Sequence, residues 1–199
     1  SLAACGNSGD QSAPGSASSN GSASTSQSDA STSTGGASSA GDASFTTVEE
    51  GKLHMSTNAA FPPYEMTTDN GGFEGIDVEV AGAIAEKLGL ELVIDDMDFD
   101  AAQVAVQQGK ADICMAGLSV TEERLAVMDF SDTYATGIQV VIVKEGSDVT
   151  LDNLGEQLIG VQRGTTGDIY CTDDYGADHV VPYDNGITAI QALSNDQVD

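Results

Sequence analysis

The segment Gly117–Arg124 combines the residue types from which a site for a small anion is built. The apolar run Ile113–Ala116 before it predicts a buried strand. Ser119 and Glu122 have the spacing of a helix capping box. A cation in the first turn of a helix opposes the helix dipole, so Arg124 has a reason to serve another task. Backbone N–H groups beside a guanidinium would bind a carboxylate, although a capped helix with a solvated arginine explains the same residues.

The composition limits the partners of the chain. Its 199 residues suffice for one or two domains. The 32 acidic and 6 basic residues give a formal net charge of -26, which argues against nucleic acids and anionic membrane surfaces as partners. This charge favours a soluble, extracytoplasmic protein. No apolar run approaches the ~20 residues of a membrane-spanning helix.

The first 44 residues differ in composition from the rest. The run Ser1–Ala4 before Cys5 resembles the end of a bacterial lipoprotein signal peptide, which predicts that Cys5 accepts a lipid and that the sequence begins part-way through this signal. A free cysteine in a disordered tail is the alternative. Residues 6–44 are almost entirely small and polar, so they are expected to form a disordered tether between residues 1–5 and a folded domain.

From Phe45 onward, strands alternate with helices, which predicts an α/β fold with a largely parallel sheet. In such sheets ligands bind beyond the carboxyl ends of the strands. The expected strands are Lys52–Thr57, Glu91–Asp95, Ile113–Ala116, Gly137–Val143, Leu158–Gln162 and His179–Tyr183. The expected helical segments are Asp77–Leu88, Asp100–Gln108, Leu151–Leu154, a helix after the turn Arg163–Gly167, and Asn185–Ser194.

Details of these elements are predicted as well. Asp77 is the expected cap of its helix, and Thr121 is a second candidate cap after Gly117. The apolar spacing predicts inward-facing side chains on two helices, namely Val80, Ala81, Ile84, Ala85 and Leu88, and Ile187, Ile190 and Leu193. Val198 and Asp199 have the pattern of a beginning strand, so we expect the second part of the domain to be incomplete in this chain.

The remaining reactive residue types favour structural roles. Cys114 is most simply a buried hydrophobe, and the spacing leaves a disulfide to Cys171 open. His54 and His179 are isolated, and Asp95–Asp98 predicts a solvated acidic turn rather than a metal site. Because the sequence has no evident nucleophile–base pair or phosphate loop, we expect neither catalysis nor a cofactor or metal.

Six motifs in series resemble the family 3 extracellular solute-binding proteins of amino-acid ABC transporters. They cover residues 45–199 and read TNAAFPPYE (57–65), GIDVEV (75–80), GKADI (109–113), GLSVTEER (117–124), DFSDTY (129–134) and VQRGTTG (161–167). The resemblance implies a two-lobed periplasmic-binding-protein-like fold of type II with the amino acid held between the lobes. It places lobe 1 at 45–136, a hinge strand at 137–144 and part of lobe 2 at 145–199.

The resemblance also assigns ligand-binding roles by position. Arg124 matches the arginine that binds the ligand α-carboxylate, which Gly117 and Ser119 also approach. Asn58 stands where many members have an acid for the α-ammonium, and an acid that completes the ammonium site in the family lies beyond this chain's end. Phe61 and Phe99 match the aromatic pair that flanks the ligand side chain. In lobe 2, Thr165 and Thr166 match donors to the ligand carboxylate, and Gln162 matches a position that sets specificity. Tyr64 and Phe130 are assigned to the core, and Arg163 to either solvent or a ligand acid.

The leading hypothesis is a monomeric, lipid-anchored receptor on the bacterial cell surface. It would bind a free polar amino acid by lobe closure and deliver it to ABC permease subunits, with its lipid as its only contact with the membrane. Two alternatives on the same fold are an enzyme similar to cyclohexadienyl dehydratase and the ligand-binding domain of a sensor. A turnover assay would reveal the enzyme, and a kinase or membrane span following the domain would reveal the sensor.

Overall fold

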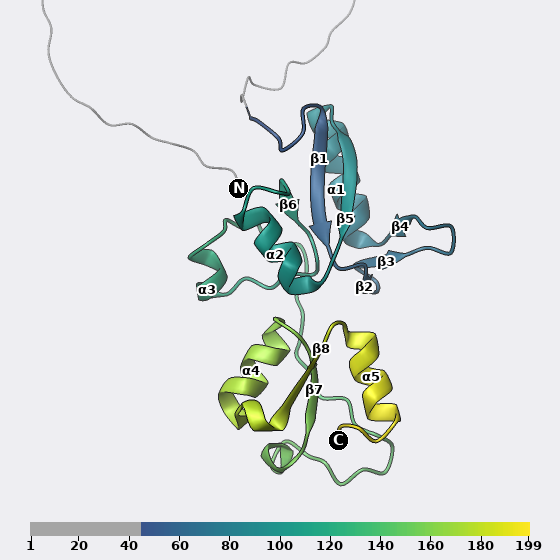
Figure 1. Cartoon of the computed structure of the whole chain (residues 1–199), viewed down its shortest axis with the longest axis vertical. Coiled ribbons are helices and arrows are strands. Elements are labelled where there is room, and N and C mark those ends of the chain that lie inside the picture. The colour runs from purple at the N-terminus through teal and green to yellow at the C-terminus, as the bar shows by residue number, and fades with distance from the viewer. Residues whose placement is uncertain (1–44) are drawn as a thin grey trace, which may run out of the picture. The chain divides into compact units, whose positions relative to one another are not determined.

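The computed structural model describes residues 45–199 (Figure 1). The predicted lipid-accepting Cys5 and the predicted tether at 6–44 lie outside the described residues. Within residues 45–199, no helix is both long enough and apolar enough to cross a membrane.

A parallel sheet forms the centre of the first half of the domain. Its strand order is β5–β1–β6, with bounds Glu91–Asp96, Lys52–Thr57 and Ile113–Cys114. In the register, Met55 of β1 lies beside Ile94 of β5 and Ile113 of β6. The predicted strand over Ile113–Ala116 is therefore shorter than expected, although Met115 and Ala116 are buried. The carboxyl ends of all three strands lead toward the residues predicted to bind ligand.

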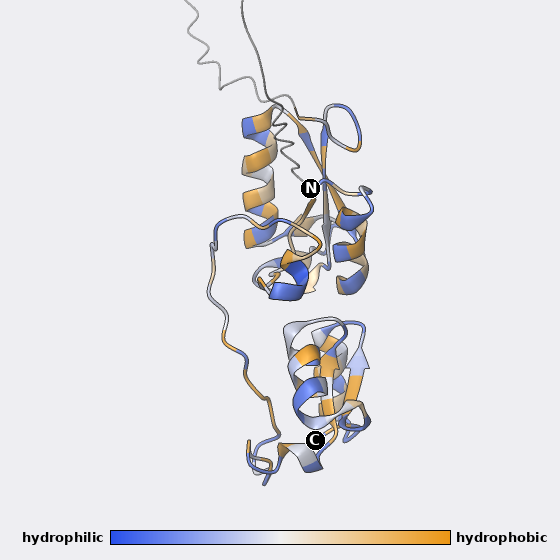
Figure 2. Ribbon diagram, turned by 90° about the vertical axis from the view of Figure 1, so that its left-hand side faces the viewer, coloured by the Kyte–Doolittle hydropathy of each residue, from blue (hydrophilic) through white to orange (hydrophobic). Residues whose placement is uncertain are grey.

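Two helices pack on this sheet, one on each face (Figure 2). Helix α1 (Ile76–Leu88) contacts β1 and β5, and α2 (Phe99–Gln107) contacts β1 and β6. The core on the α1 face centres on Met55, Ala81 and Met115. The core on the α2 face includes Ala105, Val106 and Ala111, against which Met97 and the free cysteine Cys114 pack. Cys114 is only partly buried, although it was predicted to be a buried hydrophobe.

The buried stripe of α1 is narrower than its apolar spacing suggests. Ala81 and Ala85 are buried, whereas Ile84 and Leu88 are exposed, which contradicts their prediction as inward residues. Val80, which is partly buried, also packs against the core on this face. The predicted end is correct, since Gly89 adopts the left-handed conformation with φ 70°.

An antiparallel ribbon of short strands follows β1 and precedes α1 in the chain. It has the order β2–β3–β4, with bounds Ala60–Phe61, Glu65–Thr67 and Phe73–Glu74. The carbonyl oxygens of Pro63 and Tyr64, in its first turn, accept hydrogen bonds from the N–H groups of Ile76 and Asp77 at 3.0 and 2.9 Å. The ribbon thereby satisfies the first N–H groups of α1, which leaves no capping task for a side chain.

The prediction of Asp77 as the cap of α1 is therefore wrong. Gly75 occupies the N-cap position without a side-chain hydrogen bond, and Asp77 lies inside the helix with no exposed surface. Its carboxylate accepts hydrogen bonds from the backbone N–H of Gly117 and from the hydroxyl of Tyr134, both at 2.8 Å. Asp77 thus fixes the loop that follows β6 and the segment that contains Tyr134.

The turn after Gly117 ends in helix α3 (Glu122–Leu125), which is a single turn. Its cap is Thr121, whose hydroxyl oxygen accepts a hydrogen bond from the Arg124 N–H at 3.2 Å, so the capping box of Ser119 and Glu122 does not form. A helix this short supplies few free N–H groups for an anion. The side chain of Arg124 therefore becomes the main feature of this segment.

The predicted hinge strand at Gly137–Val143 is not a strand in the described residues. The segment is extended and largely hydrophobic (Figure 2), but it pairs with no other described strand. Ile138 and Val140 are 84% and 74% exposed, respectively, so the segment is not covered by the described part of the chain. β-Branched residues favour an extended backbone, but a strand also requires a neighbour.

The C-terminal part of the domain repeats the α/β pattern on a smaller scale. Strands β7 (Ile159–Gln162) and β8 (Val180–Tyr183) are parallel, with helices α4 (Thr166–Tyr175) and α5 (Gly186–Ser194) packed against both. Two short 3-10 turns, η1 (Leu154–Glu156) and η2 (Ala177–His179), complete it. Most predicted bounds here are correct to within a few residues.

Two predicted details of this part need correction. Ala192 is buried on α5, but Ile187 and Ile190 are each 49% exposed, so the predicted inward stripe does not form in the described residues. Val198 and Asp199 are not assigned to a strand, although Val198 is buried and the Asp199 N–H donates to the carbonyl of Leu158 at 2.9 Å.

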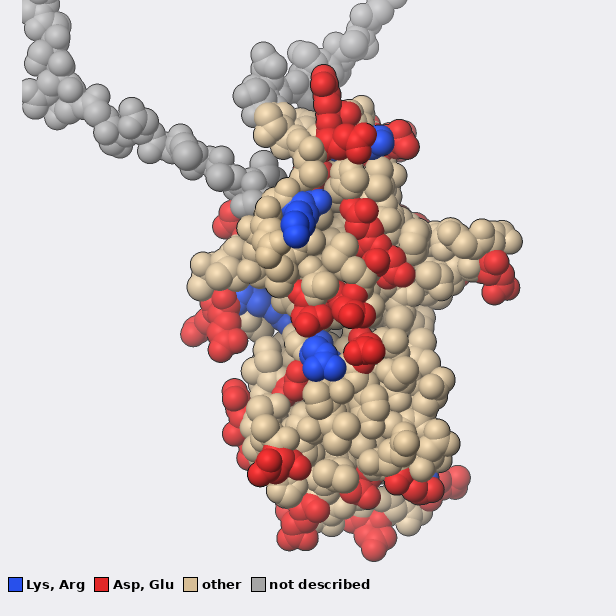
Figure 3. All heavy atoms as spheres, in the orientation of Figure 1, with Lys and Arg blue, Asp and Glu red and all other residues tan. Residues whose placement is uncertain are grey.

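Acidic side chains outnumber basic ones on the visible face (Figure 3), as the net charge predicts.

Candidate functional site

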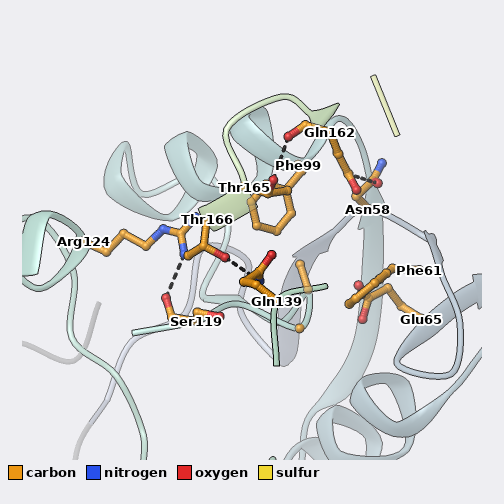
Figure 4. A pocket seen from close by; sticks show the side chains of 12 residues that line it. Asn58, Phe61, Glu65, Phe99, Ser119, Arg124, Gln139, Gln162, Thr165 and Thr166 are labelled. Atoms are coloured by element: carbon orange, nitrogen blue, oxygen red, sulfur yellow. Dashed lines mark hydrogen bonds between the residues drawn. The ribbon is translucent and has the colours of Figure 1, made fainter. Parts of the chain in front are cut away.

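A cavity of about 210 Å³ is lined by residues from several segments that lie far apart in the sequence (Figure 4). Its volume is below the ~300–1,000 Å³ of pockets for drug-sized ligands, which indicates a smaller molecule. All nine residues predicted to bind ligand line it, together with three residues that the prediction missed. The nine are Asn58, Phe61, Phe99, Gly117, Ser119, Arg124, Gln162, Thr165 and Thr166, and the three are Glu65, Ala116 and Gln139.

Arg124 is the cation of the cavity and is 6% exposed. Its Nε donates to Gln103 Oε1 at 3.0 Å, its Nη1 to the Ser119 carbonyl at 2.8 Å and its Nη2 to the Gly164 carbonyl at 3.0 Å. Burial lowers the pKa of the guanidinium, which nevertheless stays charged. All three acceptors are neutral, and within residues 45–199 no carboxylate lies within ion-pair distance of this guanidinium.

A buried charge without a counter-ion is unfavourable unless a partner arrives. Arg124 therefore has the electrostatic requirement of an anion site, and its guanidinium has five N–H groups, of which three make the hydrogen bonds above. The ring of Phe99, whose centroid is 5.7 Å from the guanidinium carbon, holds the side chain from one side. Ser119 was predicted to approach the ligand carboxylate. In the structure its backbone carbonyl also orients Arg124.

Asn58 and Gln162 meet at another side of the cavity. Asn58 follows β1 and is 8% exposed, and its Nδ2 donates to the Met97 carbonyl at 2.9 Å. Its Oδ1 accepts a hydrogen bond from Gln162 Nε2 at 3.0 Å. This bond and the one between Arg124 and Gly164 join the parts of the chain on either side of the extended segment 137–143.

Helix α4 begins at the cavity, where Thr165 and Thr166 lie. The Thr165 hydroxyl donates to the Gln162 carbonyl at 2.8 Å and accepts from the Asp168 N–H at 3.3 Å, so this hydroxyl caps α4. Thr166 is the first residue of α4 and its N–H has no partner within the helix. The Thr166 hydroxyl oxygen accepts from Gln139 Nε2 at 3.0 Å. Gln139 was missed because its segment was expected to be a hinge strand only.

The aromatic walls differ in burial. Phe99 is buried, whereas Phe61 is 44% exposed and stacks on Tyr64 with ring centroids 5.3 Å apart. Phe61 also lies over Gly117, where a Cβ would be 2.8 Å from the ring. Because Gly117 has a φ of 55°, both its conformation and its contact with Phe61 favour glycine. Tyr64, which the prediction assigned to the core, instead supports the wall of the cavity.

Glu65 is the functional candidate that the sequence prediction missed. Its side chain lines the cavity and is 1% exposed, no described group donates to either carboxyl oxygen, and its hydrogen-bonding neighbour is the carboxyl group of Asp77. Burial, with the nearby Asp77 carboxylate, raises the pKa of Glu65 to about 9. Figure 4 shows Arg124 and Glu65 on opposite sides of the cavity. The sequence could have indicated Glu65, because a turn with two prolines separates it from Phe61. The two residues pair across this turn, between β2 and β3.

The other residues considered from sequence lie elsewhere. Arg163 is half-exposed, lies 3.6 Å from Asp184 and does not line the cavity. His54 pairs with Asp95 at 2.8 Å, and His179 bonds the Gln157 carbonyl at 3.2 Å, so both histidines have structural contacts. Cys114 and Cys171 are free thiols, and the described residues contain no cluster of metal-binding side chains.

Residues 53–198 match the family described as bacterial extracellular solute-binding proteins, family 3. The chain belongs to this family. Its structure is similar to the arginine-bound form of truncated ArgBP from T. maritima, with a TM-score of 0.71 and 38% sequence identity over 75% of this chain and 71% of that one. The fold is accordingly the two-lobed α/β fold of the periplasmic amino-acid-binding proteins.

Two curated relatives show the same relationship. The probable histidine-binding protein of Neisseria gonorrhoeae is 31% identical over 162 residues, which are 79% of this chain and 60% of that protein. The arginine-binding extracellular protein ArtP of Bacillus subtilis is 36% identical over 115 residues, which are 57% of this chain and 45% of that protein. This family 3 chain thus spans about half the length of these two relatives, both of which are named as binding proteins.

Proposed function

We propose that this chain is the ligand-binding part of an extracytoplasmic receptor that delivers a free amino acid to an ABC permease. The observation that carries the proposal is the buried guanidinium of Arg124, which faces a small cavity with only neutral acceptors. An α-carboxylate would supply its missing counter-charge, with the Thr166 N–H as a further donor. Arg124 precedes segment 137–143 in the chain, in lobe 1, and Thr166 follows it, in lobe 2. A ligand that contacts both residues therefore favours lobe closure.

The side chain of this ligand is proposed to be basic. From the sequence alone, the acidic composition favours a cationic ligand, whereas Arg163 favours an anionic or neutral one. The sequence therefore predicts only that the amino acid is polar. Arg163 does not line the cavity, whereas Glu65 does, on the side opposite Arg124. A ligand whose carboxylate binds Arg124 would extend its side chain toward Glu65, between Phe61 and Phe99. Three of the similar proteins are named for arginine or histidine, which supports this choice.

Attachment to the membrane is a separate part of the proposal. Cys5 would carry the lipid, and residues 6–44 would tether a monomeric binding domain at the outer face of the cytoplasmic membrane. Expression of the full-length protein with Cys5→Ser tests this proposal. The variant is expected in the medium, whereas retention of the variant on the membrane would contradict lipid attachment at Cys5.

Calorimetry on the full-length protein with the free L-amino acids tests the receptor function. Wild type is expected to bind one or more basic amino acids. Arg124→Ala should reduce the affinity by about 10²–10⁴-fold, since two charge-assisted hydrogen bonds of ~1.5–3 kcal/mol each are lost. Arg163→Ala, which removes an arginine outside the cavity, is the matched control and should bind like wild type. Failure of wild type to bind any amino acid would overturn the function, and unchanged affinity in Arg124→Ala would overturn the role of Arg124.

A further inference from the structure

Within residues 45–199, Glu65 is the only ionisable residue whose buried side-chain oxygens accept no hydrogen bond. It is 1% exposed and lines the cavity, and no described N–H or O–H group donates a hydrogen bond to either of its carboxyl oxygens. Its hydrogen-bonding neighbour is the carboxyl group of Asp77. Buried polar groups in folded proteins are nearly always hydrogen-bonded. A buried carboxyl group in a cavity wall, to which no protein group donates and whose neighbour is a second carboxyl group, therefore points to a donor supplied by the ligand.

The groups around Glu65 disfavour its negative charge. Asp77 of α1 is the nearest carboxylate and is fully buried, and Tyr134 donates its hydroxyl to Asp77 rather than to Glu65. Cys114 of β6 and Tyr64 of the preceding turn are the other titratable neighbours, and burial raises the pKa of the Cys114 thiol to about 11. None of these groups supplies a positive charge near neutral pH.

The remaining charged groups do not change this balance. Glu74 lies on β4, opposite Met66, and is exposed. Arg124 lines the same cavity but on its other side (Figure 4). Within residues 45–199, no lysine or arginine forms an ion pair with Glu65. Burial and the Asp77 charge thus keep the unliganded Glu65 carboxyl protonated near neutral pH, in line with its pKa of about 9.

We infer that Glu65 selects the ligand side chain by exchanging a proton, so that a cationic side chain enters the cavity only when the Glu65 proton leaves to solvent. The inference rests on the proposed amino-acid-binding function. In the exchange, the neutral carboxylic acid loses its proton to the buffer and becomes a carboxylate, while the ligand keeps its positive charge. A guanidinium placed beside a neutral acid would be desolvated without a counter-charge, which is costly.

A neutral polar side chain has a different requirement. The protonated carboxyl can accept a hydrogen bond from such a side chain while its own proton stays directed at Asp77, so no proton leaves. Cationic and neutral ligands therefore differ in their proton count. Below the pKa of Glu65, affinity for a cationic ligand should rise with pH by up to tenfold per unit, whereas affinity for a neutral ligand should be constant.

Calorimetry on the full-length protein at pH 7.0, in phosphate and in Tris, measures the protons released on binding. L-Arginine and L-citrulline, which has a neutral ureido group in place of the guanidinium, are the two probes. Wild type is expected to release close to one proton per arginine and close to none per citrulline. Glu65→Gln, which resembles the protonated acid in shape, should release none with arginine and bind arginine at least about tenfold more weakly.

The matched control is Glu74→Gln, which removes an exposed glutamate from the neighbouring strand and should leave the proton count unchanged. Arginine binding to wild type without proton release, or equal release by Glu65→Gln, would overturn the inference while leaving the receptor function standing. Failure of both probes and of all other amino acids to bind would overturn the proposed function instead. Thermal unfolding verifies the fold of Glu65→Gln, and the wild-type comparison of two buffers decides the question if that variant does not fold.

Discussion

The buried carboxylate of Asp77 offers a quantitative test of how the cavity loop is fixed. Asp77→Ala removes the acceptor of two hydrogen bonds, from the Gly117 N–H and the Tyr134 hydroxyl, each 2.8 Å long. The Gly117 N–H left without an acceptor costs about 1–3 kcal/mol, whereas Tyr134 is 49% exposed, so its hydroxyl can turn to water and loses only the ~0.5–1.5 kcal/mol of an ordinary hydrogen bond. Removal of a buried charge beside Glu65 offsets part of this loss. We expect a loss of about 3 kcal/mol in the free energy of unfolding.

Glu79→Ala is the matched control for this change. Glu79 is an exposed acid in the same first turn of α1, so its loss removes a similar interaction with the helix dipole, of about 0.3–1 kcal/mol, and no buried hydrogen bond. Urea unfolding measures both variants. With a slope near 2 kcal/mol/M, a loss of about 3 kcal/mol lowers the midpoint of Asp77→Ala by about 1.5 M.

Two outcomes would contradict the reasoning on Asp77. A loss within about 1 kcal/mol of that for Glu79→Ala would show that the buried hydrogen bonds contribute little. Unchanged hydrogen exchange at the Gly117 amide would show that Asp77 does not hold this loop, because local opening should become easier once its acceptor is gone. A residue that merely capped α1 would affect the helix start without affecting Gly117.

Two further predictions concern glycine and histidine positions. Gly75→Ala should lower the free energy of unfolding by more than about 3 kcal/mol, because its Cβ would lie 2.3 Å from the Tyr64 carbonyl oxygen, whereas Gly89→Ala, with open space around its Cβ, should cost only the ~1–2 kcal/mol of a left-handed conformation. Equal losses in urea unfolding would refute the collision. The hydrogen bond to Asp95 raises the pKa of His54, so its contribution, about 1 kcal/mol or less, is present below about pH 6.5 and disappears as the pH rises through the raised pKa. His54→Gln should remove this pH dependence, and identical stability profiles from pH 5 to 9 would refute it.

The sequence predicted most strands and helices because their signals are local. Alternating and helical periodicities gave the bounds of β1, β5, α2 and α5 to within about one residue, and Asn185 forms the capping box of α5 with Thr188. The predicted strand at 137–143 failed because a strand needs a neighbour that local sequence does not specify. Exposure of Ile84 and Ile187 likewise depends on which surfaces the rest of the domain covers.

The candidate site was predictable where motifs set the spacing and unpredictable where tertiary contacts decide. The nine predicted residues surround one cavity, although their roles in binding remain predictions. Asp77 had the position of a cap, but carbonyl groups of the β2–β3 turn took that task and freed its carboxylate for Gly117. Glu65 gave no local sign of burial, since its environment arises only when the ribbon, α1 and the segment with Tyr134 come together.

The ribbon β2–β4 separates two tasks within the cavity. Residues 60–74 supply Phe61 and Glu65, whereas Arg124 and Thr166 come from distant parts of the chain. The ribbon's strands are paired with one another, so its backbone hydrogen bonds do not depend on the identity of those two side chains. Under the proposed function, selection acting on this one short stretch can therefore change which side chain is preferred without altering the residues proposed to bind the carboxylate common to all amino acids.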